Sequence, residues 1–131
     1  MNITITIPGK PFGKQRPRAT RMGRMYTPAE TVAFESIVRQ IAVEHFPEPL
    51  VGPVKVTVIA TFVPAESWSA KKRAAHLHRP HIQKPDCDNC AKAILDGLNR
   101  IAFADDAQVA EISARKVWGI IEQTVVHVEA L

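Results

Sequence analysis

The stretch PDCDNCAK, residues 85–92, contains the side chains of this sequence that are best suited to catalysis. Asp86 and Asp88 stand one residue apart, and Lys92 follows four residues after the second aspartate. Proline keeps the residue before it extended and Asp88-Asn89 is a typical helix start, so we expect both aspartates in extended or capping backbone just before a helix. Side chains at positions i and i+2 of an extended chain point the same way. The spacing therefore predicts two carboxylates on one side of the chain, where they can share a metal ion.

Two carboxylates and a lysine are the groups that metal-assisted phosphodiester hydrolysis requires. Mg²⁺ is usually bound by one or two protein carboxylates together with water and substrate phosphate. Lys92 lies one helical turn after Asp88 and on the same side, so it can reach the same phosphate. We predict that the acids hold a metal ion, which activates water and neutralises developing charge, and that the lysine stabilises the transition state.

A second acidic pair, Asp105 and Asp106 in FADDAQV, precedes the C-terminal strands. We expect chain reversal at this element edge to bring the pair back beside the first one, so that three or four carboxylates converge within a basic surface. Each piece also has a structural interpretation: Asp88 as a helix cap, the second pair as a turn, and Lys92 as the surface ion-pair partner of Asp96. The co-occurrence of these residues favours the catalytic interpretation.

Basic residues are concentrated in the N-terminal two-thirds of the chain. The formal net charge is +4, but residues 1–84 carry 13 Lys and Arg against 5 Asp and Glu, whereas residues 85–131 carry 4 against 8. This distribution is typical of a protein that binds a polyanion. The basic residues are most concentrated in a loop of about residues 9–26 and in a histidine-rich segment of about residues 66–84. A solvated basic loop is the alternative. The cations that we expect to hold DNA through its phosphates, without reading its sequence, are Lys14, Arg16, Arg18, Arg21, Arg24, Lys71, Lys72 and Arg73.

The hydrophobic pattern predicts one small α+β domain over residues 1–131. With 131 residues and a hydrophobic content of 46%, the chain is long enough for a single core. NITITI near the N-terminus and VKVTVIATFV over residues 54–63 alternate with the period of a strand. The last segment predicts two strands joined near Gly119, which we expect to form a C-terminal antiparallel hairpin. We expect a mixed β-sheet with the helices packed on one face.

Three helices are expected between these strands. A capping box formed by Thr27 and Glu30 predicts a helix that ends near residue 46. A second helix is predicted from Asp88 to about residue 100, with an apolar stripe for the core. A short basic helix with a serine cap is expected between them, in the histidine-rich segment.

The chain shows no pattern of a membrane or secreted protein. No apolar run approaches the roughly 18 residues that a membrane span needs, and the N-terminus alternates apolar with polar residues instead of forming a signal-peptide block. Cys87 and Cys90 are the two cysteines, and they give no disulfide framework. We therefore expect a cytoplasmic protein with reduced thiols.

The same two cysteines follow three histidines, which raises an alternative of another class. His76, His78 and His81 with Cys87 and Cys90 supply enough ligands for zinc, as in a zinc-stabilised nucleic-acid-binding module without nuclease activity. Zinc sites usually repeat tight ligand pairs, and Cys90 lies near the apolar face of its helix, where a free cysteine behaves as a small hydrophobe. We therefore prefer the hydrolase. The two tryptophans of the chain can stack on bases or simply pack, and the pattern does not decide between these roles.

The residues also resemble a known family. PDCDNCAKAILDGLN followed by AFADDAQV is similar to the D-x-D-N-x-x-K-x-x-x-D … D-D-x-Q signature of the RusA-type Holliday junction resolvases, small endodeoxyribonucleases that are common in prophages. The N-terminal stretches GKQRPRAT and GRMYTP are similar to those of phage members. The resemblance covers most of the chain and includes the order of the elements.

The resemblance implies a metal site, a catalytic residue and an assembly. It places Asp86, Asp88 and Asp106 at the family's Mg²⁺-binding positions, with Mn²⁺ as a substitute, and Lys92 at the catalytic lysine. Asp105 matches a neighbouring acid whose role stays open. The resemblance also implies a homodimer that binds a four-way DNA junction and nicks two opposed strands in recombination and repair.

Overall fold

A four-stranded mixed sheet is the centre of the computed structural model, which describes all residues from 1 to 131. The strands are ordered β1-β6-β4-β5, with β4 parallel to β5 and antiparallel to β6, and β6 antiparallel to β1. Side chains along β4 alternate between buried and half-buried, as the period of two predicts. The strands are β1 (Asn2–Pro8), β4 (Val54–Phe62), β5 (Val109–Trp118) and β6 (Gln123–Ala130).

The C-terminal strands run antiparallel to each other as predicted, but they are not paired in a hairpin, because β4 lies between them. The connection after β5 crosses the end of β4, where the backbone N–H of Gly119 donates to the carbonyl of Phe62 at 2.8 Å. A Cβ on Gly119 would lie 2.5 Å from the side chain of Thr61. Glycine therefore permits a tight crossing over β4, and the expected direct pairing of β5 with β6 is wrong.

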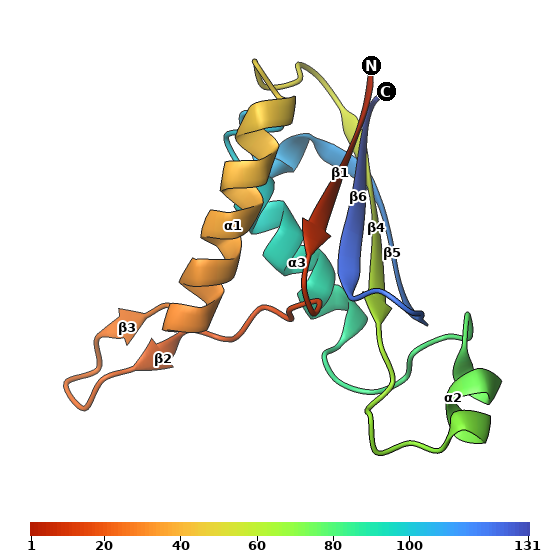
Figure 1. Ribbon diagram of the computed structural model, residues 1–131. Coiled ribbons are helices and arrows are strands. Elements are labelled where there is room, and N and C mark those ends of the chain that lie inside the picture. Colours follow the sequence, from red (N-terminus) through yellow and green to blue (C-terminus); the bar gives the residue numbers. More distant parts are fainter.

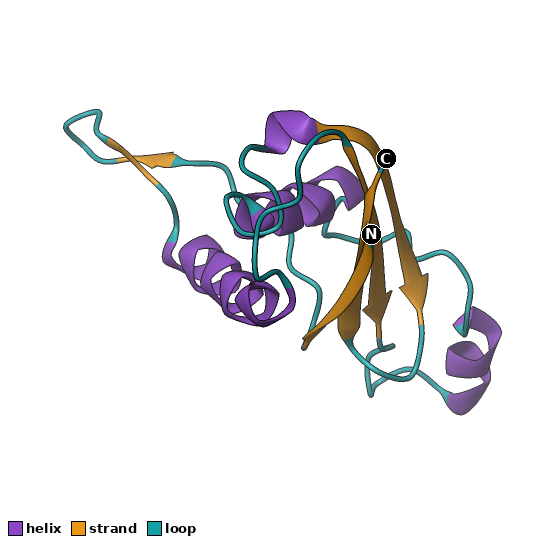
Figure 2. Ribbon diagram, turned by 90° about the horizontal axis from the view of Figure 1, so that it is seen from above, coloured by secondary structure: helices purple, strands orange, loops and turns teal.

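Two helices cover one face of this sheet, as Figures 1 and 2 show. Helix α1 (Ala29–His45) packs against α3 (Cys87–Leu98), and a Cβ on Gly97 would lie 2.7 Å from Val38, so the helices approach closely at this glycine. Both helices bury apolar side chains against the sheet in one main core. The expected α+β architecture with helices on one face is confirmed. No helix of the structure is long and apolar enough to cross a membrane.

The predicted helix starts differ in detail from those observed. Pro28 is the N-cap of α1 and makes no side-chain capping bond, so the expected capping box of Thr27 and Glu30 is absent. The chain before this helix is held instead by the short strands β2 (Arg18–Ala19) and β3 (Met25–Tyr26), which pair within the expected basic loop. The third helix begins at Cys87 rather than Asp88.

The basic segments project away from the core. The β2–β3 hairpin extends from the start of α1, and the short helix α2 (Ala70–His76) lies at the opposite side of the molecule in both views (Figures 1 and 2). Ser69 caps α2, accepting a hydrogen bond from the backbone N–H of Lys72 at 3.1 Å. The segment that follows α2 leads directly to α3, so that the acidic motif begins between the two basic elements.

Candidate active site and nucleic-acid interface

The acidic motif forms the N-terminal end of α3. Asp86 is the N-cap residue, in extended backbone and without a side-chain capping bond, and Asp88 lies in the first turn. The sequence placed both residues in chain just before the helix, which is wrong for Asp88. Both carboxylates instead lie at the end of the helix where the macrodipole is positive, which favours negative charge. They are exposed, so either one can accept an additional ligand.

Asp86 forms an ion pair with a neighbouring lysine. The ammonium of Lys84 lies 2.7 Å from Oδ1 of Asp86. This hydrogen bond, followed by the charges of Lys84 and Lys116, lowers the pKa of the Asp86 carboxyl below its usual value. An exposed ion pair of this kind contributes little to stability. The Asp86 carboxylate therefore stays ionised to a lower pH than an ordinary aspartate, and its second oxygen is free to bind a cation.

Lys92 lies one turn after Asp88 and is weakly paired. Its side chain is 63% exposed, and its ammonium is 4.0 Å from Asp96, which already binds Lys14 at 2.5 Å. Asp88 and Lys92 both line a groove of about 410 Å³ against β5, beside Ile112. The structure therefore confirms that this carboxylate and this ammonium share one face of the helix, and the ion pair expected in the structural interpretation is a loose one.

Asp105 and Asp106 lie at the 3₁₀ helix before β5, away from the first turn of α3. Asp105 caps the 3₁₀ helix η1 (Asp106–Gln108) through a reciprocal capping box with Gln108, whose amide also donates to the carbonyl of Leu50 at 2.9 Å. This ties the pair to the end of the sheet where β4 and β5 begin. The structural interpretation of this acidic pair was a turn. It agrees with the position of Asp105, which caps a short helix at a change of chain direction.

The first turn of α3 lies at the other end of β5. Lys116, near the end of this strand, donates to the carbonyl of Pro85 at 2.7 Å, and Cys90 packs against Trp118. From Val109 to Lys116 an extended strand spans about 23 Å, at about 3.3 Å per residue. The convergence of both acidic pairs within one chain, expected from the sequence, therefore does not occur, and no group of three His, Cys, Asp or Glu side chains is placed to hold a metal ion.

The β2–β3 hairpin and the residues just before it carry four free guanidinium groups. Arg16, Arg18, Arg21 and Arg24 are exposed and form no ion pair. They project on an element that lies outside the core (Figure 1). This is the arrangement that contacts to a phosphate backbone require.

Lys14 differs from these arginines, because its ammonium is already bound by two carboxylates. Its ammonium binds Glu35 of α1 at 2.9 Å and Asp96 of α3 at 2.5 Å, and only 19% of the side chain is exposed. Burial alone would lower the pKa of Lys14, but hydrogen bonds and charges from the two carboxylates together raise it. Lys14 therefore anchors the start of the basic loop to both helices.

The three cations of α2 have different environments. Lys71 is exposed, whereas the ammonium of Lys72 lies 4.1 Å from the ring centroid of Trp68. Arg73 is half-buried and lines a separate depression with Leu77. Helix α2 and the β2–β3 hairpin therefore present cations on either side of the first turn of α3.

The proposed zinc ligands are not assembled. His76 donates through Nδ1 to the carbonyl of Lys72 at 2.7 Å, and His81 is buried and stacks on Phe62 with ring centroids 3.8 Å apart. Cys90 is buried in the core, and burial raises the pKa of its thiol to about 11. These side chains do not converge on a common point that could hold a metal ion, so the geometry gives no support to the zinc module.

The family model for "Endodeoxyribonuclease RusA" matches residues 8–129, which include both acidic pairs and both basic segments. The chain belongs to the RusA endodeoxyribonuclease family. Among curated proteins, this RusA-family chain is similar to "Uncharacterized protein YqaN" of Bacillus subtilis (strain 168), with 31% identity over 124 residues, covering 88% of this chain and 87% of that protein. The resemblance seen in the sequence is confirmed, and the enzyme class is an endodeoxyribonuclease.

Two residues of the candidate site were not assigned from the sequence. Lys84 donates to the carboxylate of Asp86, and Lys116 donates to the carbonyls of Gln83 and Pro85 at 2.5 and 2.7 Å. Lys84 has a signal in the sequence, because it stands two residues before the aspartate. Lys116 has none, because it reaches the motif from a strand that follows much later in the chain.

Proposed function

We propose that this RusA-family endodeoxyribonuclease is a Mg²⁺-dependent resolvase that cuts four-way DNA junctions by paired nicking. The observation that supports this best is the placement of Asp86, Asp88 and Lys92 at one exposed helix end, between two projecting basic elements. Asp86, the N-cap residue, makes no side-chain capping bond, and one oxygen of Asp88 accepts the backbone N–H of Asn89 at 3.0 Å, so each carboxylate keeps one oxygen free.

The donor set suits a hard divalent cation. Two exposed carboxylates with a free oxygen each are the number that Mg²⁺ commonly takes from protein, the other positions going to water and substrate phosphate. Such an ion supplies a water of lowered pKa and polarises the scissile phosphate. Asp86 and Asp88 would hold it, and Mn²⁺, which favours the same oxygen ligands, would substitute.

The remaining residues bind and stabilise the DNA. Lys92 is directed to the same groove as Asp88, where a cation offsets charge that develops on the phosphate or the leaving oxygen. The hairpin arginines and Lys71 would hold the flanking duplex by its phosphates. Because a phosphate-binding surface alone does not select a branched substrate, the junction preference is proposed from the family.

Paired nicking requires two active sites, and we propose a homodimer. Within one chain Asp106 is separated from Asp86 by about the length of β5, about 23 Å. A second chain placed across the groove beside β5 would bring its own Asp106 to the first turn of α3. In that arrangement only the dimer has a complete set of acids in each site. The enzyme, of the prophage type, would resolve junctions in DNA recombination and repair in the cytoplasm.

The proposal is tested by incubating the protein with a labelled four-way junction, a matched linear duplex and a single strand, each with Mg²⁺ or with a chelator. We expect symmetric nicks in the junction, only with the metal ion, and a much slower reaction on the other two substrates. Equal rates on junction and linear duplex would remove the junction preference and leave an unselective endonuclease.

A further inference from the structure

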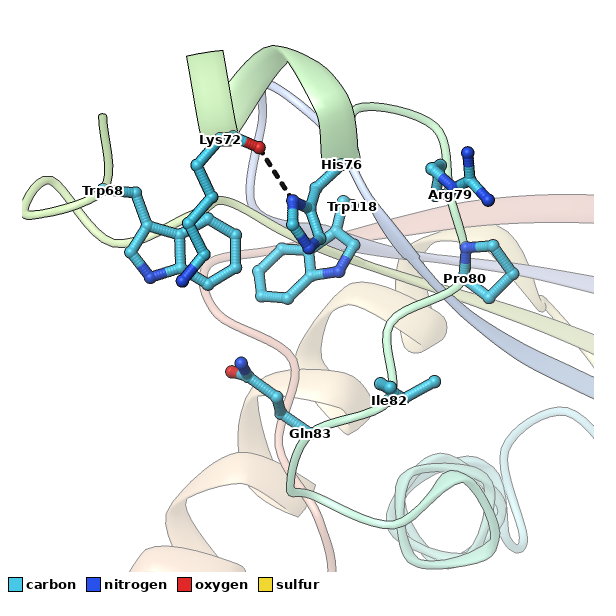
Figure 3. A pocket seen from close by; sticks show the side chains of 8 residues that line it. All are labelled: Trp68, Lys72, His76, Arg79, Pro80, Ile82, Gln83 and Trp118. Carbon is cyan, nitrogen blue, oxygen red and sulfur yellow. Dashed lines mark hydrogen bonds between the residues drawn. The ribbon is translucent and has the colours of Figure 1, made fainter. Parts of the chain in front are cut away.

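A pocket of about 420 Å³ lies beside the acidic motif, between α2 and the segment that leads from α2 to α3. It is within the range of about 300–1,000 Å³ that ligand pockets occupy. Figure 3 shows Lys72 and His76 of α2 and Trp68, two residues before this helix, close to Trp118. Gln83 lies across the opening. The residues that carry the argument are Trp68, Lys72, His76, Arg79, Gln83 and Trp118.

The wall of this pocket is an aromatic cluster that the fold holds in place. The rings of Trp68 and Trp118 are tilted by 53° with centroids 5.0 Å apart, and His76 lies 4.8 Å from Trp68. Trp118 is only 5% exposed and packs on Phe62 in a second core, whereas Trp68 is half-buried. A wall that is anchored on one side and open on the other presents π-faces to a flat ligand.

The charge of the pocket determines what kind of flat ligand fits. Lys72 lies 4.1 Å from the centroid of Trp68 and Arg79 is exposed, and no carboxylate lines the pocket. A cationic ligand would be repelled, because a lysine already occupies the position over the indole. An aromatic group joined to an anion fits both features, and the Gln83 amide can donate to and accept from the edge of that group.

The pocket is fixed relative to the acids of the motif. Lys116 donates to the carbonyl of Gln83 at 2.5 Å and to that of Pro85 at 2.7 Å, which clamps the connecting segment to β5. Asp86 follows immediately. A ligand in the pocket is therefore held at a constant offset from the scissile phosphate.

We propose that this pocket binds one unpaired nucleotide of the DNA substrate, with its base against the open side of Trp68, which Trp118 supports from the core, and its phosphate at Lys72 and Arg79. Bases of an intact duplex are stacked on each other and must be unpaired to reach a protein pocket. The proposal rests on the proposed function in one respect, namely that the substrate is branched DNA whose strands can expose such a nucleotide. Such a pocket would select DNA with an unpaired nucleotide over intact duplex, which phosphate contacts alone do not do.

The two tryptophans of the chain both belong to this pocket, so intrinsic fluorescence reports on it directly. We would titrate the protein, with chelator to prevent cleavage, with a short oligothymidylate and with an abasic oligonucleotide of the same number of phosphates. We expect the oligothymidylate to quench the emission and the abasic strand to leave it nearly unchanged. Equal quenching by both strands would overturn the proposal, because phosphate binding alone would explain it.

Variants of the pocket give a second measurement, by anisotropy of a labelled oligothymidylate. Trp68→Leu should weaken binding by about tenfold or more, the size of one base–aromatic stack, and Trp68→Phe should retain part of it. Lys72→Ala should weaken binding more than Lys71→Ala, which removes the same charge from the same helix outside the pocket. Equal losses in the two lysine variants, or normal binding by a folded Trp68→Leu protein, would contradict the pocket assignment.

The two proposals fail separately. Wild-type protein that cuts junctions with Mg²⁺ but shows no base-dependent quenching would overturn the nucleotide pocket and leave the resolvase proposal intact. Base-dependent quenching by a protein that never cuts junctions would support the pocket and overturn the resolvase proposal. Circular dichroism and thermal unfolding of each variant establish that it is folded before its binding is compared.

Discussion

At the scale of single residues, substitution of a carboxylate at the start of α3 should reduce cleavage without reducing DNA binding. Asp86→Asn removes one charged metal ligand without adding bulk, so we expect the cleavage rate to fall by orders of magnitude. Junction affinity should persist or increase, because a negative charge near phosphate has been removed. The measurements are single-turnover cleavage with Mg²⁺ and binding in a chelator.

Glu111 provides a matched control for that prediction. It is exposed on β5 and its only ion pair, with Lys55, is long at 3.9 Å. Glu111→Gln therefore removes the same charge away from the first turn of α3, and its cleavage rate should stay close to wild type. Normal cleavage by Asp86→Asn would show that the metal site is elsewhere.

Lys92 is predicted to act on the transition state and not as an anchor. Lys92→Ala should remove nearly all cleavage with a modest loss of junction affinity, since only one of many phosphate contacts is lost. Its packing role is small, because its side chain is 63% exposed. Lys71→Ala is the control, with a similar effect on affinity and near-normal cleavage at saturating protein. A Lys92→Ala protein that does not bind DNA would instead identify an anchoring residue.

His81 in the aromatic cluster should make the stability of the fold depend on pH. Burial, then the charge of Lys116, lowers the pKa of His81 below the usual histidine value of 6.5, and the Lys10 charge acts in the same direction. Its Nδ1 is buried without a hydrogen-bond partner. Above pH 6.5 the ring is neutral in both the folded and the unfolded chain, so it adds no pH dependence there.

As the pH falls below 6.5, the unfolded chain takes up this proton first, and the folded state loses stability until the pH passes the lowered pKa. His81→Phe keeps the stack on Phe62 and removes the titration. We therefore expect the melting temperature of wild type to fall relative to that of the variant as the pH is lowered from neutral. A constant difference between the two proteins across the same pH range would contradict the prediction.

At the scale of elements, the β2–β3 hairpin and the start of the loop before it have different functions. Changing Arg16, Arg18 and Arg21 to Ala should lower the slope of log affinity against log salt by about 0.9 per lost contact, roughly 3 units in all. Cleavage at low salt and saturating protein should recover towards wild type, because binding is weakened without altering the transition state. Junction affinity measured over a series of salt concentrations tests this.

Lys14→Ala is the contrasting variant in the same loop. It removes the ion pairs with Glu35 and Asp96 and leaves both carboxylates partly buried, so it should lower the melting temperature while leaving the salt slope nearly unchanged. A hairpin variant with an unchanged slope and normal cleavage would exclude the hairpin from DNA binding. Neither result for the hairpin variant would contradict the catalytic role proposed for the acids of α3.

At the scale of the whole molecule, the separation of Asp106 from Asp86 makes the dimer testable by complementation. If Asp106 acts in the site of a second chain, the Asp86→Asn and Asp106→Asn proteins should each be inactive alone. Mixed dimers contain one site with all its acids and should recover cleavage, as single nicks rather than paired cuts. The measurement compares each variant with a co-refolded mixture on the same labelled junction.

The other outcomes of this mixing experiment are equally definite. A mixture that stays inactive would place Asp106 in the site of its own chain, after a rearrangement of η1. Full activity of the Asp106→Asn protein by itself would reduce this residue to a part of η1, beside the capping role that Asp105 already has. Sedimentation analysis of the wild type gives the size of the assembly independently.

The sequence alone was sufficient for the features that depend on neighbouring residues. Strand and helix periods, the serine cap of α2 and the grouping of Asp86, Asp88 and Lys92 are local, because each is fixed by side chains within a few positions of one another. The signature that resembled the RusA family has the same basis: its main part lies within a single helix and the residue that caps it.

Tertiary structure decided the features that depend on distant partners. The insertion of β4 between β5 and β6 follows from which strands pair. The distance from Asp106 to Asp86 follows from the contact of Pro85 with Lys116, near the end of β5. Lys14 is basic like its neighbours in the loop, yet its ammonium binds Asp96, 82 positions away, and so anchors the loop to α3. The aromatic pocket unites Trp68 with Trp118 in the same way. Such partners are selected by packing across the whole chain, and no local pattern contains that information.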